Sequence, residues 1–445
     1  MDLKTRTDEL ERALAHVPMF DIHTHLVGDK LSARGLHDVL LYHMVVSDLY
    51  SAGCPSGARL TQFPGWASKE EGHARIREAL PYLKYIPNTN IFWCLRMILK
   101  DLYNWNEPIT AGNWRKLDDL IRERADDRAW QAGLLDRVNI KRSVTELARR
   151  GSGRDDDKLQ YSLEWAMFAR CQWGESDTAL YELERCWGRP PESPAPIGGT
   201  RPKPDKTIQS LADVHTAMKH YVRVIPYGKI VSTAATLSSD IDYAPVSDKE
   251  MAAAIKRRNT AGPAERNIYG SYIQEAFLTE LEKHGHEIVY QFALGAEPLP
   301  FETGSRVYQR TFAQLGEMVG RHPKLRFQCF LASRHGNQTL CSLARELPNL
   351  SLAGFWWHNF YATTVCQVLA ERLEMLPTNK QMGFFSDAYC LEWAYGKAIL
   401  VRKMMAKVLA QKIADGQYTQ DDALKIARAI LYDAPMEVLG MKPKK

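Results

Sequence analysis

Two histidines near the start of the chain are spaced so that both could bind one metal ion. His23 and His25 end a short apolar run that contains Phe20 and Ile22. Side chains of an extended chain alternate between its two faces, so the two imidazoles project from the same side. Neutral imidazole is a common ligand of transition metals. The pair is therefore a candidate metal site, and the alternative is a chance pair among the 13 histidines of the chain.

Asp387 is the candidate for a third metal ligand. It closes the last predicted strand, Gly383 to Asp387, and the first and last strands of a closed barrel are neighbours. Two imidazoles and one carboxylate leave coordination positions open for water or substrate, as a catalytic site requires. We expect one divalent metal ion there, zinc by first choice, with manganese, iron or cobalt also compatible. The structural role of Asp387 would be to cap the N-terminus of the helix that follows, and both roles can coexist.

These residues need a scaffold of strands, and runs rich in β-branched or aromatic residues recur along the chain. After the histidine strand we expect strands at Val138–Val144, Trp165–Arg170, Lys229–Thr233, Ile288–Leu294, Leu325–Leu331, Leu350–Phe355 and Met382–Phe385. Helical patterns separate most of them, at Ile268–Lys283, Thr311–Val319, Thr339–Leu347 and Ala362–Met375. Eight strands with helical crossovers predict an α/β fold, a distorted (β/α)8 barrel of the TIM type.

The first strand is followed by a long segment that reads as helical. Residues from about 36 to 128 are rich in Trp and Tyr and are too many for a simple connection between neighbouring strands. We therefore predict a helical insertion after the first strand. The chain divides into residues 1–35 with an N-terminal helix and the first strand, residues 36–130 as the insertion, and residues 131–445 as the rest of the barrel.

A barrel of this type carries its chemistry at the C-terminal ends of its strands. That rule assigns structural roles to Lys229 and to the second His-x-His pair, His284 and His286, which precede their strands. Further candidates for substrate contact follow strands, namely Arg170, Arg334, His335, Trp356 and Trp357. Arg170 ends an apolar run, so its charge must reach water, a carboxylate or an anionic ligand. For the two tryptophans the alternative role is packing in the core.

Composition places the chain among ordinary globular enzymes. Its 445 residues are 45% hydrophobic and 25% charged, and the formal charge is +5. No basic run suggests nucleic-acid binding, and no apolar run is long enough for a signal peptide or a membrane span. The 8 cysteines show no paired spacing, so reduced thiols are expected. We expect a cytoplasmic enzyme with a small-molecule substrate and no nucleic-acid or membrane partner, and a homo-oligomer is left open.

Several motifs in this order and spacing resemble one enzyme family. They are Asp21-Ile22-His23-Thr24-His25-Leu26, Leu41-Tyr42-His43, Arg170 with Trp187-Gly188 beyond it, Ser333-Arg334, Gly354-Phe355-Trp356-Trp357, Glu374-Met375-Leu376 and Ser386-Asp387-Ala388. Over about residues 8 to 430 the chain resembles the uronate isomerases of the amidohydrolase superfamily. The resemblance implies a single divalent metal ion and the conversion of D-glucuronate to D-fructuronate, or of D-galacturonate to D-tagaturonate.

The resemblance also implies roles for individual residues. His23, His25 and Asp387 would bind the metal ion, and Asp387 would also move the proton between two adjacent substrate carbons. His43 would reach the substrate from the helical insertion. Arg170 and Arg334 would hold the carboxylate or the hydroxyls of the sugar.

Two positions differ from the family pattern. Tyr389 replaces an Arg two residues after the last-strand Asp, and Met44 replaces a Tyr after His43. Tyr389 is kept as a catalytic candidate that can donate one hydrogen bond but brings no charge. These differences leave open whether the reaction is the family's own or has been redirected.

Two alternatives to an isomerase are kept. The first is a hydrolase of the same superfamily, acting on a lactone, amide or modified sugar, with Asp387 as general base and His335 as a further ligand. A two-metal site is not expected, because the fifth strand ends without His. The second alternative is a metal-free binding protein that retains the barrel.

Overall fold

The computed structural model describes most of the chain. The described residues are 2–55, 67–150, 158–164, 178–187, 204–237, 243–260, 262–285, 288–295, 307–357 and 360–441.

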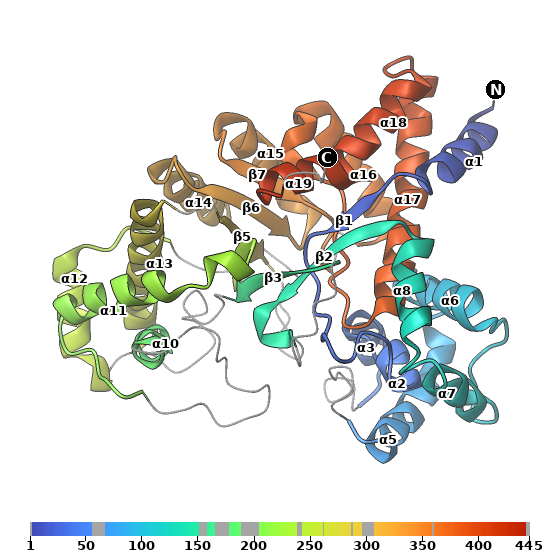
Figure 1. Ribbon diagram of the computed structural model, residues 1–445, viewed down its shortest axis with the longest axis horizontal. Helices are drawn as coiled ribbons and strands as arrows, with labels where there is room; N and C mark the ends of the chain where they lie inside the picture. The colour runs from blue at the N-terminus through green and yellow to red at the C-terminus, as the bar shows by residue number, and fades with distance from the viewer. Residues whose placement is uncertain are drawn as a thin grey trace.

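In the part of the chain that the structure describes, eight strands form one sheet in which every neighbouring pair is parallel and the order follows the sequence, β1 to β8 (Figure 1). The strands are β1 (Met19–Asp21), β2 (Ile140–Glu146), β3 (Leu159–Glu164), β4 (Ser232–Leu237), β5 (Val289–Leu294), β6 (Arg326–Leu331), β7 (Leu350–Ala353) and β8 (Gln381–Met382). Sequential parallel pairing with helical connections is the strand arrangement of a TIM-type barrel.

The sheet curls until the segments that follow β1 and β8 meet. The amide of Asp387 donates to the carbonyl of His23 at 3.0 Å, and the amide of His25 donates to the carbonyl of Ala388 at 2.8 Å. Every residue of β5 is buried, which is typical of parallel strands covered on both faces. The curled sheet therefore brings residues from both ends of the chain together at its C-terminal edge.

The opposite end of the curled sheet is covered by the last helical turns, η8 (Ala429–Asp433) and α19 (Ala434–Val438). Met436 packs in the same buried cluster as Phe20 and Phe330 from β1 and β6. The amide of Gly383 donates to the carbonyl of Ile430 at 2.7 Å. That bond takes the chain away from β7, so β8 has only two residues and the approach to Asp387 is extended but irregular.

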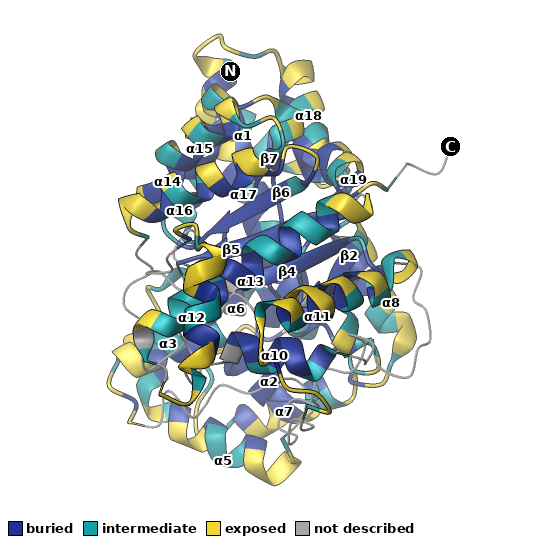
Figure 2. Ribbon diagram, turned by 90° about the vertical axis from the view of Figure 1, so that its left-hand side faces the viewer, coloured by how far each residue is buried: buried dark blue, intermediate teal, exposed yellow. Residues whose placement is uncertain are grey.

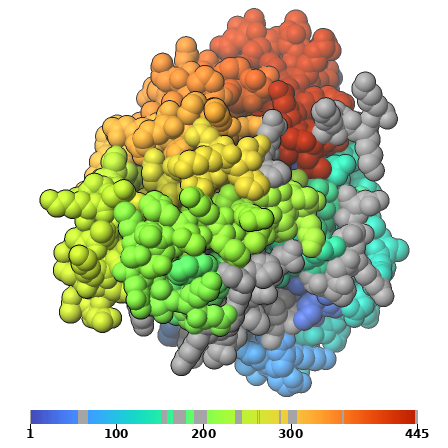
Figure 3. All heavy atoms as spheres, turned by 60° about the vertical axis from the view of Figure 1, so that its left-hand side comes forward, coloured from blue at the N-terminus to red at the C-terminus, as the bar shows by residue number. Residues whose placement is uncertain are grey.

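Helices surround the sheet, with their buried faces toward it and their exposed faces outward (Figure 2). Those of the barrel are α10 (Thr178–Cys186), α11 (Leu211–Val224), α12 (Asp248–Lys256), α13 (Pro263–His284), α14 (Gln309–Arg321), α15 (Asn337–Glu346), α16 (Ala362–Met375), α17 (Leu391–Ala414) and α18 (Gln420–Arg428). In Figure 3 the green to yellow helical region forms one continuous face below the orange and red C-terminal part. No described helix is long and apolar enough to cross a membrane.

The described residues between β1 and β2 contain helices and one isolated β-bridge. The helices are α2 (Leu36–Leu40), α3 (His43–Ser51), α5 (Lys69–Ala79), η1 (Leu80–Tyr85), α6 (Asn90–Tyr103), α7 (Trp114–Arg122) and α8 (Arg128–Arg137). They gather on one side of the molecule, next to one end of α17 (Figure 1). α17 packs against α6 and α8, and also against α1 (Leu3–Leu14) and α16. The limits 1–35, 36–130 and 131–445 of the expected units stay predictions.

The observed strands correct some expected positions. The third strand is Leu159–Glu164, whereas the expected run Trp165–Arg170 lies outside the described residues. The fourth strand begins at Ser232 instead of Lys229, because Tyr227–Lys229 forms a 3-10 turn after Pro226. The second strand extends two residues past its expected end, as far as Glu146. The helix expected at Ala362–Met375 has those same limits.

Candidate metal and catalytic site

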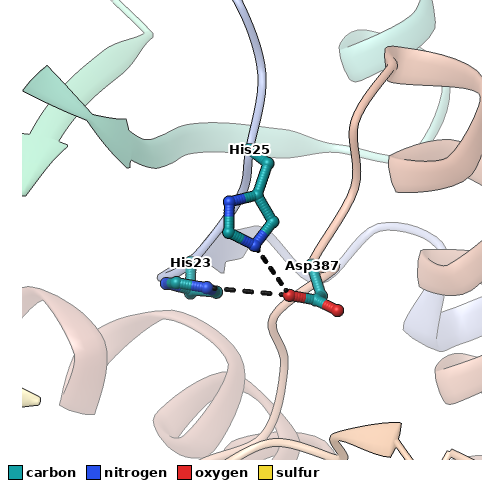
Figure 4. Close-up of side chains that lie close together, drawn as sticks. All are labelled: His23, His25 and Asp387. Carbon is teal, nitrogen blue, oxygen red and sulfur yellow. Dashed lines mark ion pairs between the residues drawn. The ribbon is translucent and has the colours of Figure 1, made fainter. Parts of the chain in front are cut away.

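His23, His25 and Asp387 lie together at the C-terminal edge of the sheet. The Nε2 atoms of His23 and His25 lie 3.6 and 3.2 Å from the same Oδ1 atom of Asp387 (Figure 4). The side chains are largely buried, with exposed fractions of 12%, 18% and 7%. Among the described residues, this is the only group of three or more His, Cys, Asp or Glu that could hold a metal ion.

The donor atoms fit a metal ion. Ligands about 2.1 Å from a tetrahedrally coordinated metal lie about 3.4 Å from one another. The observed separations of 3.2 and 3.6 Å between nitrogen and oxygen atoms bracket this value. Three mixed nitrogen and oxygen ligands also leave a position open, as in catalytic sites. The geometry therefore supports a single divalent ion and does not distinguish zinc from manganese, iron or cobalt.

The backbone of Asp387 adopts an unusual conformation that aims its carboxylate at the histidines. Its φ angle is +54°, in the left-handed region that few residues other than Gly adopt. The conformation is held by the bond from its amide to His23 and by a bond from the Tyr42 hydroxyl to its carbonyl, at 3.0 Å. Such strain is commonly found at functional sites. The alternative role of Asp387 as a helix cap is wrong, because Cys390 is the N-cap of α17.

A second carboxylate contacts His25 from the other side of its ring. Nδ1 of His25 lies 2.6 Å from Oε1 of Glu146, the last residue of β2. Oε2 of Glu146 accepts a hydrogen bond from Nε of Arg149 at 2.5 Å, and Arg149 is in the η2 turn (Leu147–Arg149) that follows. His25 is therefore flanked by the carboxylates of Glu146 and Asp387.

The two histidines next to Asp387 have shifted pKa values in opposite directions. Burial, together with the neighbouring His25, lowers the pKa of His23 to about 4. Burial also opposes charge on His25, but Glu146 and Asp387 outweigh it and raise its pKa to about 9. For Asp387 burial would raise the pKa, yet His25 holds it below its ordinary value. Without a metal ion, the His25 ring is thus cationic at neutral pH, with one hydrogen on each nitrogen, between two carboxylates.

His43, the first residue of α3, faces the same carboxylate. Its Nε2 lies 3.5 Å from Oδ2 of Asp387, whereas His23 and His25 are nearest to Oδ1. Neither ring nitrogen has a hydrogen-bond partner among the residues that the structure describes, although both are buried. Burial lowers the pKa of His43 to about 3, so the ring is neutral. A buried neutral imidazole with two unsatisfied nitrogens is suited to contact a polar ligand.

Aromatic rings form the wall around these groups. Trp357 lies 5.0 Å from the His43 ring and has φ of +48°, a second left-handed residue at the site. Tyr389 stacks on His25, with ring centroids 4.8 Å apart, and meets His43 edge to face at 5.6 Å. Trp356, by contrast, packs in the buried cluster inside the sheet.

The other predicted residues are placed differently. Arg334 and His335 are exposed, and Arg334 contacts Gln367 on α16. Met44 is buried in α3. Arg170 lies outside the described residues. The roles predicted for Arg170, Arg334 and His335 stay predictions.

A buried lysine supports the site from α17, and the sequence reasoning did not identify it. Nζ of Lys397 donates to the Tyr42 hydroxyl at 2.7 Å, and that hydroxyl donates to the Asp387 carbonyl. Lys397 is only 2% exposed, and burial lowers its pKa to about 8. The signal in the sequence was a single lysine on an otherwise apolar face of the predicted last helix, which indicates a buried lysine with a polar partner. Arg149 was also missed, although its spacing of three residues from Glu146 is a recognisable ion-pair spacing.

Comparison with known proteins identifies relatives of this fold. No protein-family model matches the sequence, and no curated protein matches it. Among solved structures, a glucuronate isomerase from Caulobacter crescentus matches at a TM-score of 0.78 and 15% identity, over 99% of this chain and 95% of that one. A uronate isomerase from Bacillus halodurans gives 0.71 and 17%, over 99% and 98%. A Lactobacillus casei protein provisionally named a metal-dependent hydrolase gives 0.59 and 12%, over 97% of each chain. The chain thus shares their fold over nearly its whole length.

Proposed function

We propose that this protein is a metal-dependent aldose-ketose isomerase that acts on a uronic acid or a closely related acidic sugar. The observation that carries the proposal is the group of His23, His25, His43 and Asp387 at one edge of a sheet whose fold is that of uronate isomerases. D-glucuronate and D-galacturonate are the first substrates to test. The metal ion, its ligands and the role of each site residue are parts of this proposal.

The reaction moves one proton between adjacent carbons of an open-chain sugar. A divalent ion held by His23, His25 and Asp387 would act as a Lewis acid toward the carbonyl and the neighbouring hydroxyl. Asp387 supplies the base: Oδ2 takes the proton from C2, and the C2–H electron pair forms the enediolate. The same oxygen then returns the proton to C1, while the hydroxyl proton on O2 passes to O1 to complete the ketose.

His43 is the group that carries the proton between the substrate oxygens. Because its pKa is lowered to about 3, it is neutral at physiological pH, with one nitrogen as donor and the other as acceptor. A neutral ring can accept one hydroxyl proton and release another without a lasting charge in a buried site. Trp357 and Tyr389 enclose this ring and limit access of water to it.

The carboxylate of the substrate needs a cationic partner. We assign that role to Arg170, with Arg334 as the second candidate, because bidentate pairing with Arg selects an acid over a neutral sugar. Both assignments come from the sequence resemblance. A cytoplasmic location and a homo-oligomeric state belong to the same set of expectations.

The test is proton NMR of the metal-loaded protein with a panel of uronic acids in deuterated water. Ketose signals with deuterium entering at C1 are expected, because the base exchanges its proton with solvent during some turnovers. Asp387→Asn should lower kcat at least 100-fold, the lower range for loss of a general base. Asp415→Asn, at an exposed position at the end of α17, is the matched control and should retain full activity.

The same experiment weighs the hydrolase alternative. Release of a new carboxylate or alcohol from lactones, without any ketose from uronates, would replace the isomerase proposal with a hydrolase. No turnover of any substrate, together with absence of bound metal, would favour the binding protein. The solved structures weigh toward isomerase, since those of higher TM-score are uronate isomerases by name.

A further inference from the structure

The contact between His25 and Glu146 has a geometry that matters for metal binding. Glu146 lies against Nδ1 of His25, whereas Nε2 of the same ring points at Asp387. A carboxylate on Nδ1 requires that nitrogen to carry the hydrogen. In the neutral ring that binds a metal ion, the lone pair is then on Nε2, which is the nitrogen that faces the site.

The backbone fixes this arrangement before any ligand arrives. β1 and β2 are paired, and the amide of Thr24 donates to the carbonyl of Val144 at 2.7 Å. The hydroxyl of Thr145 donates to the carbonyl of Leu26 at 2.7 Å. Hydrogen bonds thus join the residues before and after His25 to residues 144 and 145. Glu146 is the next residue of that strand, so its side chain is held beside His25.

Arg149 fixes the other end of the carboxylate. Glu146 and Arg149 are 8% and 7% exposed, so the charge of the carboxylate would be costly without a partner. The guanidinium carbon also lies 5.9 Å from the Tyr389 ring, and Tyr389 stacks on His25. His25 is therefore held by Glu146 at its edge and by Tyr389 across its face, and Arg149 contacts both of these side chains.

We propose that Glu146 and Arg149 form a positioning pair that holds His25 in the orientation and tautomer of a metal ligand. The inference rests on the proposed metal site. The pair acts through His25 and does not itself touch the metal ion or the substrate. It also makes the two histidine ligands unequal, since a carboxylate raises the electron donation of His25 only. Loss of such a carboxylate partner typically costs 10- to 100-fold in metal affinity.

The test compares metal affinity of full-length variants by titration of Zn²⁺ against a chelating indicator. Glu146→Gln should raise the Kd about 10- to 100-fold, and Arg149→Met should raise it less, because the carboxylate remains. Glu184→Gln is the matched control. Glu184 is a 2% exposed carboxylate that accepts hydrogen bonds from Arg258 and from the Ile208 amide, and it is not among the ligand group.

A second measurement separates positioning from a general loss of structure. The visible spectrum of the Co²⁺-loaded protein reports on ligand geometry and should change in Glu146→Gln but not in Glu184→Gln. Equal Kd values and equal spectra for Glu146→Gln and the unchanged protein would overturn the positioning pair, with the metal site intact. If the unchanged protein binds neither Zn²⁺ nor Co²⁺, the proposed metal site is wrong, and the positioning pair fails with it.

Discussion

At the scale of single residues, the position of His43 favours a catalytic role over a role as metal ligand. Its Nε2 lies as near to Asp387 as that of His23 does, at 3.5 Å against 3.6 Å, but to the other carboxylate oxygen. Because Oδ2 of Asp387 is the proposed base, a residue next to Oδ2 would lie beside the bound substrate. The competing role for His43 is that of a third histidine ligand, and a substitution distinguishes the two.

His43→Asn should lower kcat about 100-fold or more while the protein still binds one metal ion. The reason is that the ring is not needed to complete the ligand set of His23, His25 and Asp387. Activity is measured on the best uronate and metal content by elemental analysis. The exposed His16 provides the control substitution, His16→Asn. Loss of the metal together with activity would make His43 a ligand instead.

At the scale of elements, α17 supports the strained segment that carries Asp387. Lys397 in α17 reaches the Tyr42 hydroxyl at the start of α3, and that hydroxyl bonds the Asp387 carbonyl. The Tyr42 ring also stacks on Trp393 of the same helix, with centroids 4.3 Å apart. The start of α3 and the helix α17, which are far apart in the chain, thus fix one backbone carbonyl.

The buried Lys397 should make stability depend on pH. Its folded pKa of about 8 is below the ordinary value of 10.5, so between these values the unfolded chain binds more protons. The free energy of unfolding should therefore rise with pH, by up to about 1.4 kcal/mol per pH unit from this group. We expect Lys397→Met to lose the contribution of Lys397 to that slope, measured as the difference from the unchanged protein in urea unfolding of the metal-free proteins between pH 8 and 10.5. The opposite contribution of His25, whose pKa is about 9, is present in both proteins.

Lys407 is the control for this measurement because it is an exposed lysine of the same helix. Lys407→Met should retain the slope of the unchanged protein. Parallel pH profiles for Lys397→Met and the unchanged protein would show that Lys397 stays charged in the folded state.

At the scale of the whole molecule, the proposed metal ion joins the two ends of the barrel. Its ligands follow β1 and β8, and those segments are already joined by backbone bonds between His23 and Asp387 and between His25 and Ala388. Tyr42 at the start of α3 and Lys397 of α17 support the same region from outside, and α17 also packs against α6 and α8. Binding an ion there should stabilise the fold, because the unfolded chain cannot bring these residues together.

Saturating Zn²⁺ should raise the free energy of unfolding by about 4 kcal/mol at 1,000 times the Kd. The expected result is a higher Tm with metal than with chelator, measured by calorimetry. His25→Asn should abolish the difference, whereas His284→Asn, at the end of α13 and outside the ligand group, should retain it. An equal response in both variants would place the stabilising metal elsewhere.

The sequence by itself determined the parts of this protein that depend on local pattern. Periodicity and chain order predict four features: the shared face of His23 and His25, the position of Asp387 after the last strand, the number of strands, and the limits of the helix Ala362–Met375. β-strand limits were less accurate, because a bond such as that of Gly383 to Ile430 ends β8 from outside the strand.

Only the tertiary structure decided which distant side chains support the site. A capping role for Asp387 was excluded only once Cys390 was seen to be the N-cap of α17, and its approach to His25 was seen only in the folded chain. The Tyr42 and Lys397 contacts join the start of α3 to α17, and Arg149 contacts Glu146, which in turn contacts His25 in the segment after β1. Such contacts depend on the packing of elements far apart in the chain, and residue periodicity carries no information about them.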